Sequence, residues 1–134
     1  MNATLVDTNV LIDVLTGHPE WLPWSSDALE RSATYGRLVI NPVIYAEISI
    51  GFPNVEDCDA AFPSSDFVRE EIPYQAAFLA GKAFLRYRRR GGRKLTPLPD
   101  LFIGAHAAIA GYRLLTRDPG RFRFYFPRLR LIAP

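Results

Sequence analysis

Short apolar segments alternate with longer helical segments along this chain, and this alternation constrains the fold more than any other feature. It predicts strands at residues 3–7, 38–40, 67–72, 113–116 and 129–133. It predicts helices at residues 9–15, 24–35, 43–50, 54–62, 74–89 and 97–112. Such alternation is typical of βαβ units, in which the sheet is parallel and covered on both faces. We therefore predict an α/β protein with a three-layer α/β/α fold, a central, mainly parallel sheet of four to five strands, and helices on both faces.

The length of 134 residues predicts a single domain, residues 1–134, that can bury a core without disulfides or a structural metal. The one cysteine, Cys58, forbids an internal disulfide and any cysteine-rich zinc site. No apolar run approaches the ~18 residues that span a bilayer, and the N-terminal segment lacks the basic region of a signal peptide. We therefore expect a small cytoplasmic protein with no membrane association.

Charge is divided unevenly between the two halves of the chain. Residues 1–80 hold twelve acidic and three basic side chains, whereas residues 81–134 hold thirteen basic and two acidic ones. Such asymmetry is typical of a chain that contacts nucleic acid or an acidic partner. A basic surface that merely faces solvent has the same composition, so both interpretations stay open at this point.

Two aspartates lie where predicted strands end. Asp7 closes the first strand, and Asp118 follows the strand at residues 113–116 by two positions. Because the carboxyl ends of parallel strands meet at one edge of the sheet, where such folds build their sites, both are candidate site residues. Each also has a structural interpretation. Asp7 could cap the following helix, and Asp118 begins an Asp-Pro-Gly turn sequence.

Two further carboxylates lie on predicted helices. Glu47 shares a helix face with Ile44 and Ile50, and a carboxylate on an apolar face needs a cation or a hydrogen-bond donor. Asp100 lies in the first turn of its helix, and Gly104, one turn later, is expected to leave space beside it. The structural alternatives are a Glu47 side chain that reaches solvent and an Asp100 that complements the helix dipole.

Four carboxylates in one place would either repel one another or bind a cation. Like charges about 4 Å apart repel by ~4 kcal/mol per pair at an effective dielectric constant near 20, so a cluster raises several pKa values unless a cation compensates. Carboxylates and water suit Mg²⁺, with Mn²⁺ as a substitute. Such a metal can activate water and neutralise a phosphoryl transition state. The pattern therefore predicts metal-assisted hydrolysis of a phosphodiester.

Four motifs carry a resemblance to a known family. LVDTNVLID, NPVIYAEI, PDLFIGAHAAIAG and LLTRDPGRFRFYFP, in this order, are similar to those of PIN-domain proteins, and more narrowly to the VapC ribonuclease toxins of bacterial toxin–antitoxin pairs. The resemblance extends over nearly the whole chain, and residues 54–72 fit it least well. It implies a single PIN-like domain that acts as a metal-dependent endoribonuclease on RNA.

The resemblance also assigns roles to residues and implies partners. The four acidic side chains described above match the catalytic, metal-binding positions of the family. Its supporting polar positions match Asn9 and Thr116. The partners that it implies are a small VapB-like antitoxin and a second copy of the toxin in a homodimer.

A dense basic run lies between the helix at residues 74–89 and the helix that carries Asp100. We predict that this run binds RNA phosphates, because an acidic centre would otherwise repel the RNA backbone. Its members are Arg86, Arg88, Arg89, Arg90, Arg93 and Lys94. A solvated helix end, where arginines complement the dipole, is the structural alternative.

Two other functions fit part of the pattern. A haloacid-dehalogenase-like phosphatase also begins with a strand that ends in aspartate, but it needs a second aspartate two residues later, where this chain has Asn9. A non-catalytic nucleic-acid-binding module would explain the basic half and leave Glu47 and Asp100 unexplained. His106 lies about 240° around the helix from Asp100, so we expect a packed or surface histidine rather than a site residue. The RNA substrate and the number of metal ions stay open.

Overall fold

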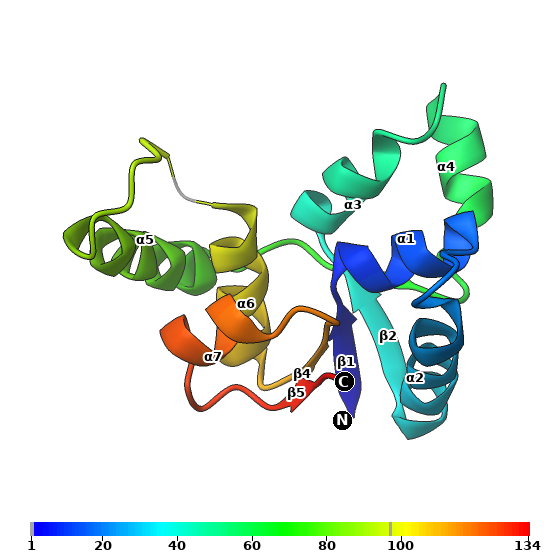
Figure 1. The fold of residues 1–134 in the computed structure, drawn as a ribbon. Helices are drawn as coiled ribbons and strands as arrows, with labels where there is room; N and C mark the ends of the chain where they lie inside the picture. Colours follow the sequence, from blue (N-terminus) through cyan, green and yellow to red (C-terminus); the bar gives the residue numbers. More distant parts are fainter. Residues whose placement is uncertain (1, 97) are drawn as a thin grey trace.

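A computed structural model gives the fold of residues 2–96 and 98–134 (Figure 1). The strands of these residues are β1 (Ala3–Val6), β2 (Arg37–Ile40), β3 (Val68–Arg69), β4 (Arg113–Leu115) and β5 (Leu131–Ile132). Their helices are α1 (Thr8–Thr16), α2 (Leu22–Tyr35), α3 (Pro42–Ser49), α4 (Val55–Ala61), α5 (Tyr74–Arg89), α6 (Pro99–Ala110) and α7 (Gly120–Tyr125). Across the described ranges, no helix combines the length and apolarity that crossing a membrane would need.

The strands form one sheet in the order β3–β2–β1–β4–β5, and every neighbouring pair is parallel. The central strand is β1, and all of its residues are buried. The chain adds β2 and β3 on one side of β1 and then returns to add β4 and β5 on the other. In open parallel sheets, ligands bind outside the carboxyl ends of the strands at such a reversal, which here lies between β1 and β4.

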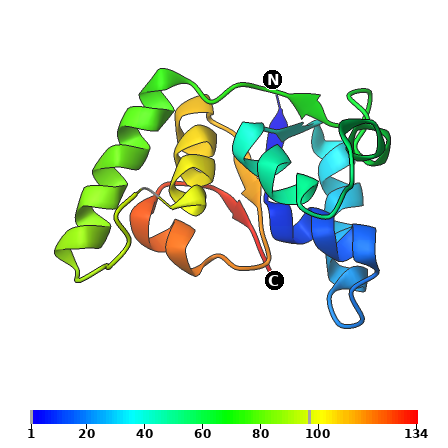
Figure 2. The ribbon, with the colours of Figure 1, turned by 90° about the horizontal axis from the view of Figure 1, so that it is seen from above.

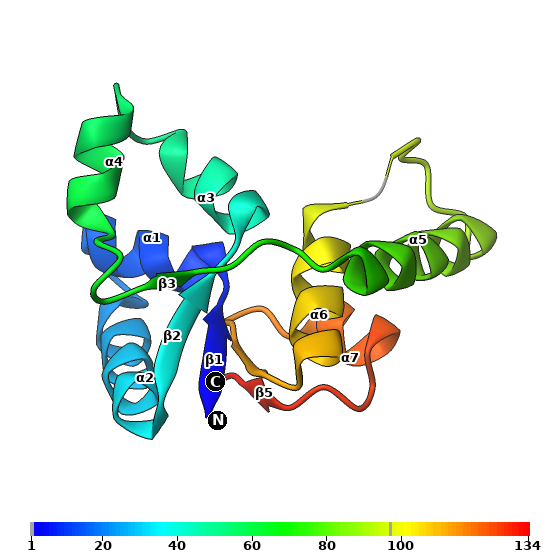
Figure 3. The same cartoon turned by 180° about the vertical axis from the view of Figure 1, so that it is seen from behind.

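Helices cover both faces of the sheet, so the predicted three-layer α/β/α fold is confirmed (Figures 1 and 3). Helices α1 and α2 pack on one side of β1 and β2, and α6 and α7 lie on the other side of the sheet. Helix α5 packs along the outer side of α6. Seen from above the carboxyl ends, α3 lies between α1 and α6 and contacts both (Figure 2). Helices α3 and α6 therefore flank the edge where β1 and β4 end.

The edge strand is shorter than predicted. The sequence indicated a strand at residues 67–72, and the structure has only Val68–Arg69. Beyond it, the Glu70 side chain turns inward and accepts hydrogen bonds from the Tyr112 hydroxyl, at 2.8 Å from each carboxylate oxygen. Pro73, which has no N–H to donate to a ladder, then begins α5 as its N-cap. The strand β5 is likewise shorter than predicted.

The helices differ from the prediction in two places. The helix predicted from residue 97 begins at Pro99, and Pro97 lies outside the described residues. Helix α7 was not predicted at all, because six residues rich in arginine and phenylalanine have no helical periodicity long enough to detect. Its buried side chains, Phe122 and Tyr125, pack it against α6. Tertiary packing, rather than helix propensity, accounts for this helix.

Of the two expectations for His106, packed or at the surface, the structure shows the first, and the residue is only 1% exposed. Its Nδ1 lies 3.0 Å from the Asn41 Nδ2, and the Asn41 Oδ1 accepts a hydrogen bond from the amide of Ile44 to cap α3. Through this buried contact the start of α3 is tied to α6. These two helices carry Glu47 and Asp100, so their side chains approach the same edge of the sheet.

Gly104 does not leave space beside Asp100, and that expectation was wrong. A Cβ atom at this position would lie 2.4 Å from Cε2 of Phe126 and 3.0 Å from Cδ1 of Phe122. Both rings are buried. The glycine therefore lets two aromatic rings pack directly against the backbone of α6.

Gly104→Ala should destabilise the fold by about 1–3 kcal/mol, because the added methyl group overpacks this buried contact. The matched control is Gly81→Ala in α5, where a Cβ atom meets nothing within 4 Å and alanine favours the helix by about 1 kcal/mol. Urea unfolding of both variants measures the difference in the free energy of unfolding. Equal stabilities of the two variants would contradict the packing role of Gly104.

Candidate active site

Asp7 lies at the carboxyl end of β1 and caps α1. Its Oδ1 accepts a hydrogen bond from the Thr8 amide at 2.7 Å, and its Oδ2 accepts one from the Thr116 hydroxyl at 2.8 Å. The residue is only 5% exposed. Burial raises the pKa of Asp7 to about 7 in spite of these hydrogen bonds, and the charges of Asp100 and Glu47 add to the rise. Asp7 is thus a carboxyl group that titrates near neutral pH.

The Thr116 hydroxyl connects the polar residues around Asp7. It donates to Asp7 and accepts hydrogen bonds from the Asn9 Nδ2 at 3.3 Å and from the Asp118 amide at 3.1 Å. The Asn9 Oδ1 accepts a hydrogen bond from the Arg117 amide at 3.3 Å. The two polar residues expected near the site therefore hold the loop after β4 against the end of β1.

Glu47 reaches the same edge from α3. Its Oε1 accepts a hydrogen bond from the Thr8 hydroxyl at 2.6 Å, and the amide of the same threonine donates to Asp7. The apolar face expected around Glu47 is only partly present, because Ile44 is buried whereas Ile50 lies beyond the end of α3 and is 85% exposed. A hydroxyl donor, rather than an apolar surface, therefore determines the position of the Glu47 carboxylate.

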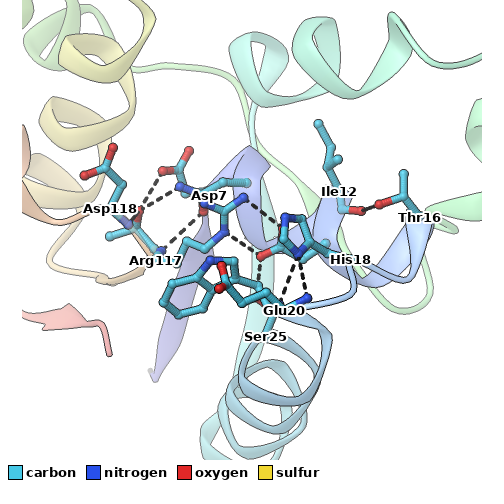
Figure 4. Close-up of polar contacts among 12 residues, drawn as sticks. Asp7, Ile12, Thr16, His18, Glu20, Ser25, Arg117 and Asp118 are labelled. Carbon is cyan, nitrogen blue, oxygen red and sulfur yellow. Dashed lines mark hydrogen bonds and ion pairs between the residues drawn. The ribbon is translucent and has the colours of Figure 1, made fainter.

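Asp100 lies in the first turn of α6 beside Arg121 of α7, which the sequence reasoning missed. The Arg121 Nη1 donates to the Asp100 Oδ2 at 3.1 Å. Burial raises the pKa of Asp100 against the effect of Arg121, and the charge of Asp118 adds to the rise. Asp118 itself is exposed, on the loop after β4, close to Asp7 and Arg117 (Figure 4).

The four carboxylates gather at one edge of the sheet without forming a three-ligand metal cluster. Charge interactions connect Asp7 with Glu47 and Asp100, and Asp100 with Asp118. Within the part of the chain that the structure describes, no group of three or more acidic, histidine or cysteine side chains is arranged to hold a metal ion. The chemistry of these ligands nevertheless fits Mg²⁺ or Mn²⁺, because both prefer oxygen and Mg²⁺ commonly takes only one or two carboxylates together with water.

An ion pair between the buried Asp13 and the partly buried Arg117, which the sequence reasoning also missed, fixes the loop after β4 to α1. The Arg117 guanidinium donates to both oxygens of Asp13, at 2.7 and 2.9 Å, and the Ser25 hydroxyl donates to Asp13 at 2.7 Å (Figure 4). Burial alone would raise the pKa of Asp13, but the hydrogen bonds from Arg117 and Ser25 outweigh it and lower that pKa. The only signal of this pair in the sequence is an aspartate inside the apolar run of α1.

Two members of the predicted basic run bind backbone carbonyls of the protein itself. Arg86 donates to the carbonyls of Phe124 and Tyr125, at 3.3 and 3.4 Å, and so holds the end of α7 against α5. Arg88 donates to the carbonyl of Lys94 at 2.9 Å. These guanidinium groups have structural contacts that the sequence interpretation did not include.

The other members of the run differ in their surroundings. The guanidinium of Arg90 lies over the ring of Phe124, 3.8 Å from its centroid. The exposed residues Arg89, Arg93 and Lys94 complete the run. The basic run is therefore not one uniform surface.

The sequence matches the PIN domain family over residues 4–126, which is most of the chain. The chain belongs to the PIN domain family. No curated protein matches the sequence closely enough to count as a relative. The family assignment accords with the parallel sheet and the helices on both of its faces.

Solved structures share this fold over nearly the full chain. VapBC2 from Rickettsia felis, bound to a DNA fragment from its promoter, has a TM-score of 0.75 at 20% identity, covering 98% of both chains. VapBC from Salmonella typhimurium, also bound to DNA, has a TM-score of 0.72 at 22% identity, covering 99% of this chain and 98% of that one. A toxin–antitoxin complex from Klebsiella pneumoniae has a TM-score of 0.65 at 26% identity, covering 89% of each chain.

Asp7→Asn should remove one component of the pH dependence of stability. The pKa of this carboxyl is about 7 in the folded protein against an ordinary 3.8, so between these values the folded state binds a proton that the unfolded state has lost. The wild type therefore loses stability as pH rises from about 4 to 7. The stability of Asp7→Asn relative to wild type should rise over this window and level off above it.

Thermal unfolding in EDTA from pH 4 to 8 measures this difference. The control is Asp66→Asn, which removes an exposed negative charge. Parallel profiles of the two variants would show that Asp7 is not the titrating group.

Proposed function

We propose that this chain is a metal-dependent endoribonuclease that acts as the toxin of a type II toxin–antitoxin pair. The observation that carries the proposal is the almost completely buried Asp7 at the end of the central strand. Glu47 and Asp100 are close enough to raise the pKa of Asp7, and the charge of Asp118 acts in turn on Asp100. Membership of the PIN family, whose members are generally nucleases, supports this activity.

In this proposal the four carboxylates hold Mg²⁺, or Mn²⁺ in its place, with Asp7 as the central ligand. When bound, the metal would activate the attacking water and neutralise charge on the phosphate. Thr116 and Thr8 orient Asp7 through their hydrogen bonds, and the nearby positive charge of a cation would favour its ionised form. Arg121 would have to share Asp100 with the cation, because its guanidinium already contacts that carboxylate.

The phosphatase and the non-catalytic binding module, the two alternative functions, do not explain these contacts. A phosphatase of the haloacid-dehalogenase type needs an acid two residues after Asp7, and Asn9 instead bridges Thr116 and the Arg117 amide. A non-catalytic nucleic-acid-binding module has no use for a cluster of carboxylates that repels phosphate. The proposal of a nuclease accounts for both the acidic edge and the basic half of the chain.

The proposed partners follow from the same resemblance. The similar structures include VapBC proteins and a toxin–antitoxin complex, which supports a small antitoxin as a partner of this chain. We further propose RNA as the substrate, a homodimer as the functional form and the cytoplasm as the site of action.

Asp100→Asn should lower metal-dependent RNA cleavage by about 100-fold or more, because even changes that only reorient metal ligands cost about 10–100-fold. The assay is cleavage of total bacterial RNA with Mg²⁺, with Mn²⁺ and with excess EDTA. Asp66→Asn, far along the chain from the four carboxylates, is the control and should cleave like wild type. Full activity of the wild type in excess EDTA would refute the metal dependence.

Expression of the wild type alone should stop bacterial growth, because uncontrolled RNA cleavage is toxic. Co-expression of the small protein encoded beside it should restore growth, and Asp100→Asn should be harmless without it. Growth curves after induction, with protein levels checked on gels, measure both effects. Harmless expression of a wild type that cleaves RNA in vitro would argue against the toxin role.

A further inference from the structure

A hollow of about 550 Å³ lies between the end of α5, the loop that follows it and α7. Its volume falls within the roughly 300–1,000 Å³ of small-ligand pockets. Tyr87, Arg90, Gly92, Arg121 and Phe124 are among the residues that line it. The four carboxylates are not, so the hollow is separate from the candidate active site.

Arg121 connects the hollow with that site. It lines the hollow, and its Nη1 lies 3.1 Å from the Asp100 Oδ2. A ligand in the hollow therefore lies one side chain away from the acidic edge. A negatively charged group of that ligand would compete with Asp100 for the guanidinium of Arg121.

The part of the wall formed by Arg90 and Phe124 offers a planar surface. The guanidinium of Arg90 lies over the ring of Phe124 at 3.8 Å, and both residues line the hollow. Arg86 keeps this wall in place, because it donates hydrogen bonds to the carbonyls of Phe124 and Tyr125. One face of the Arg90 guanidinium is thus covered by the ring, and the residue is exposed to solvent.

The hollow would therefore suit a ligand that has both a flat group and an anionic group, and a nucleotide has both. Arginine planes and aromatic rings stack on the bases of single-stranded RNA, and arginines bind its phosphates. We propose that the hollow binds one nucleotide of a single-stranded RNA, with its base stacked on Arg90 and its phosphate at Arg121. This inference rests on the proposed function, because it places that nucleotide beside the one whose phosphate reaches the carboxylates.

An acidic peptide is the other anionic ligand that such a hollow could attract, and the observations favour RNA. A peptide carboxylate would use only the charges of Arg90 and Arg121. The stacked arrangement of Arg90 on Phe124 instead presents a plane, which a carboxylate does not need. A ligand with a base should therefore bind more tightly than one of equal charge without a base.

The test compares a short fluorescent oligoadenylate with an abasic ribose-phosphate strand of the same length. Binding is measured by fluorescence anisotropy in EDTA, so that no cleavage occurs. The wild type should bind the oligoadenylate about tenfold more tightly than the abasic strand, as expected for one stacked base. Arg90→Lys keeps the charge but removes the plane, so it should lower this ratio to about one.

Arg89→Ala is the matched control, because Arg89 is exposed on the same turn and does not line the hollow. It should weaken both strands equally, through lost charge, and leave their affinity ratio unchanged. Arg121→Ala should also weaken both strands and lower the salt slope by about 0.7 for one phosphate contact.

An unchanged affinity ratio in Arg90→Lys would overturn the proposal, as would equal binding of the two strands by the wild type. Tighter binding of an oligoglutamate peptide than of oligoadenylate would also overturn it, in favour of a protein ligand. A wild type that cleaves RNA with Mg²⁺ but lacks the base-dependent ratio would refute this inference alone. A wild type that has the ratio but never cleaves would refute only the proposed nuclease.

Discussion

The carboxylate of Asp7 is held almost out of water at the end of the central strand, and the geometry of the whole carboxyl edge follows from that burial. A buried carboxylate is unfavourable unless donors compensate for the lost water. The Thr8 amide and the Thr116 hydroxyl provide part of this compensation, and each comes from a different segment of the chain. The start of α1 and the loop after β4 are thereby brought to one point.

A second buried carboxylate, that of Asp13 in α1, also holds the loop after β4 in place. Asp13 binds Arg117 through both oxygens, next to the loop that carries Thr116 and Asp118. Loss of Arg117 would leave the buried carboxylate of Asp13 with only the Ser25 hydroxyl to compensate its charge. The two aspartates thus differ in function. Asp13, within α1, holds the loop, whereas Asp7, the N-cap of α1, faces the other carboxylates.

The sequence predicted those features that depend on local pattern. Strand ends at Asp7 and before Asp118 could be located because parallel strands bring their carboxyl ends to one edge. Gly104 could not be interpreted correctly, because its neighbours Phe122 and Phe126 come from a distant segment. The pairing of Arg121 with Asp100 could not be predicted either. Arg121 lies in α7, which forms because of its packing and has no helical pattern in its own sequence.

The contact between Asp7 and Thr116 joins residues that lie 109 positions apart in the chain. The strands β1 and β4 are adjacent in the sheet, but the ribosome synthesises β2, β3 and six helices between them. A nascent chain therefore carries Asp7 without the hydroxyl that orients it until 109 further residues have been added. The acidic edge can assemble only after the residues of β4 have left the ribosome, so its formation follows the synthesis of every element between β1 and β4.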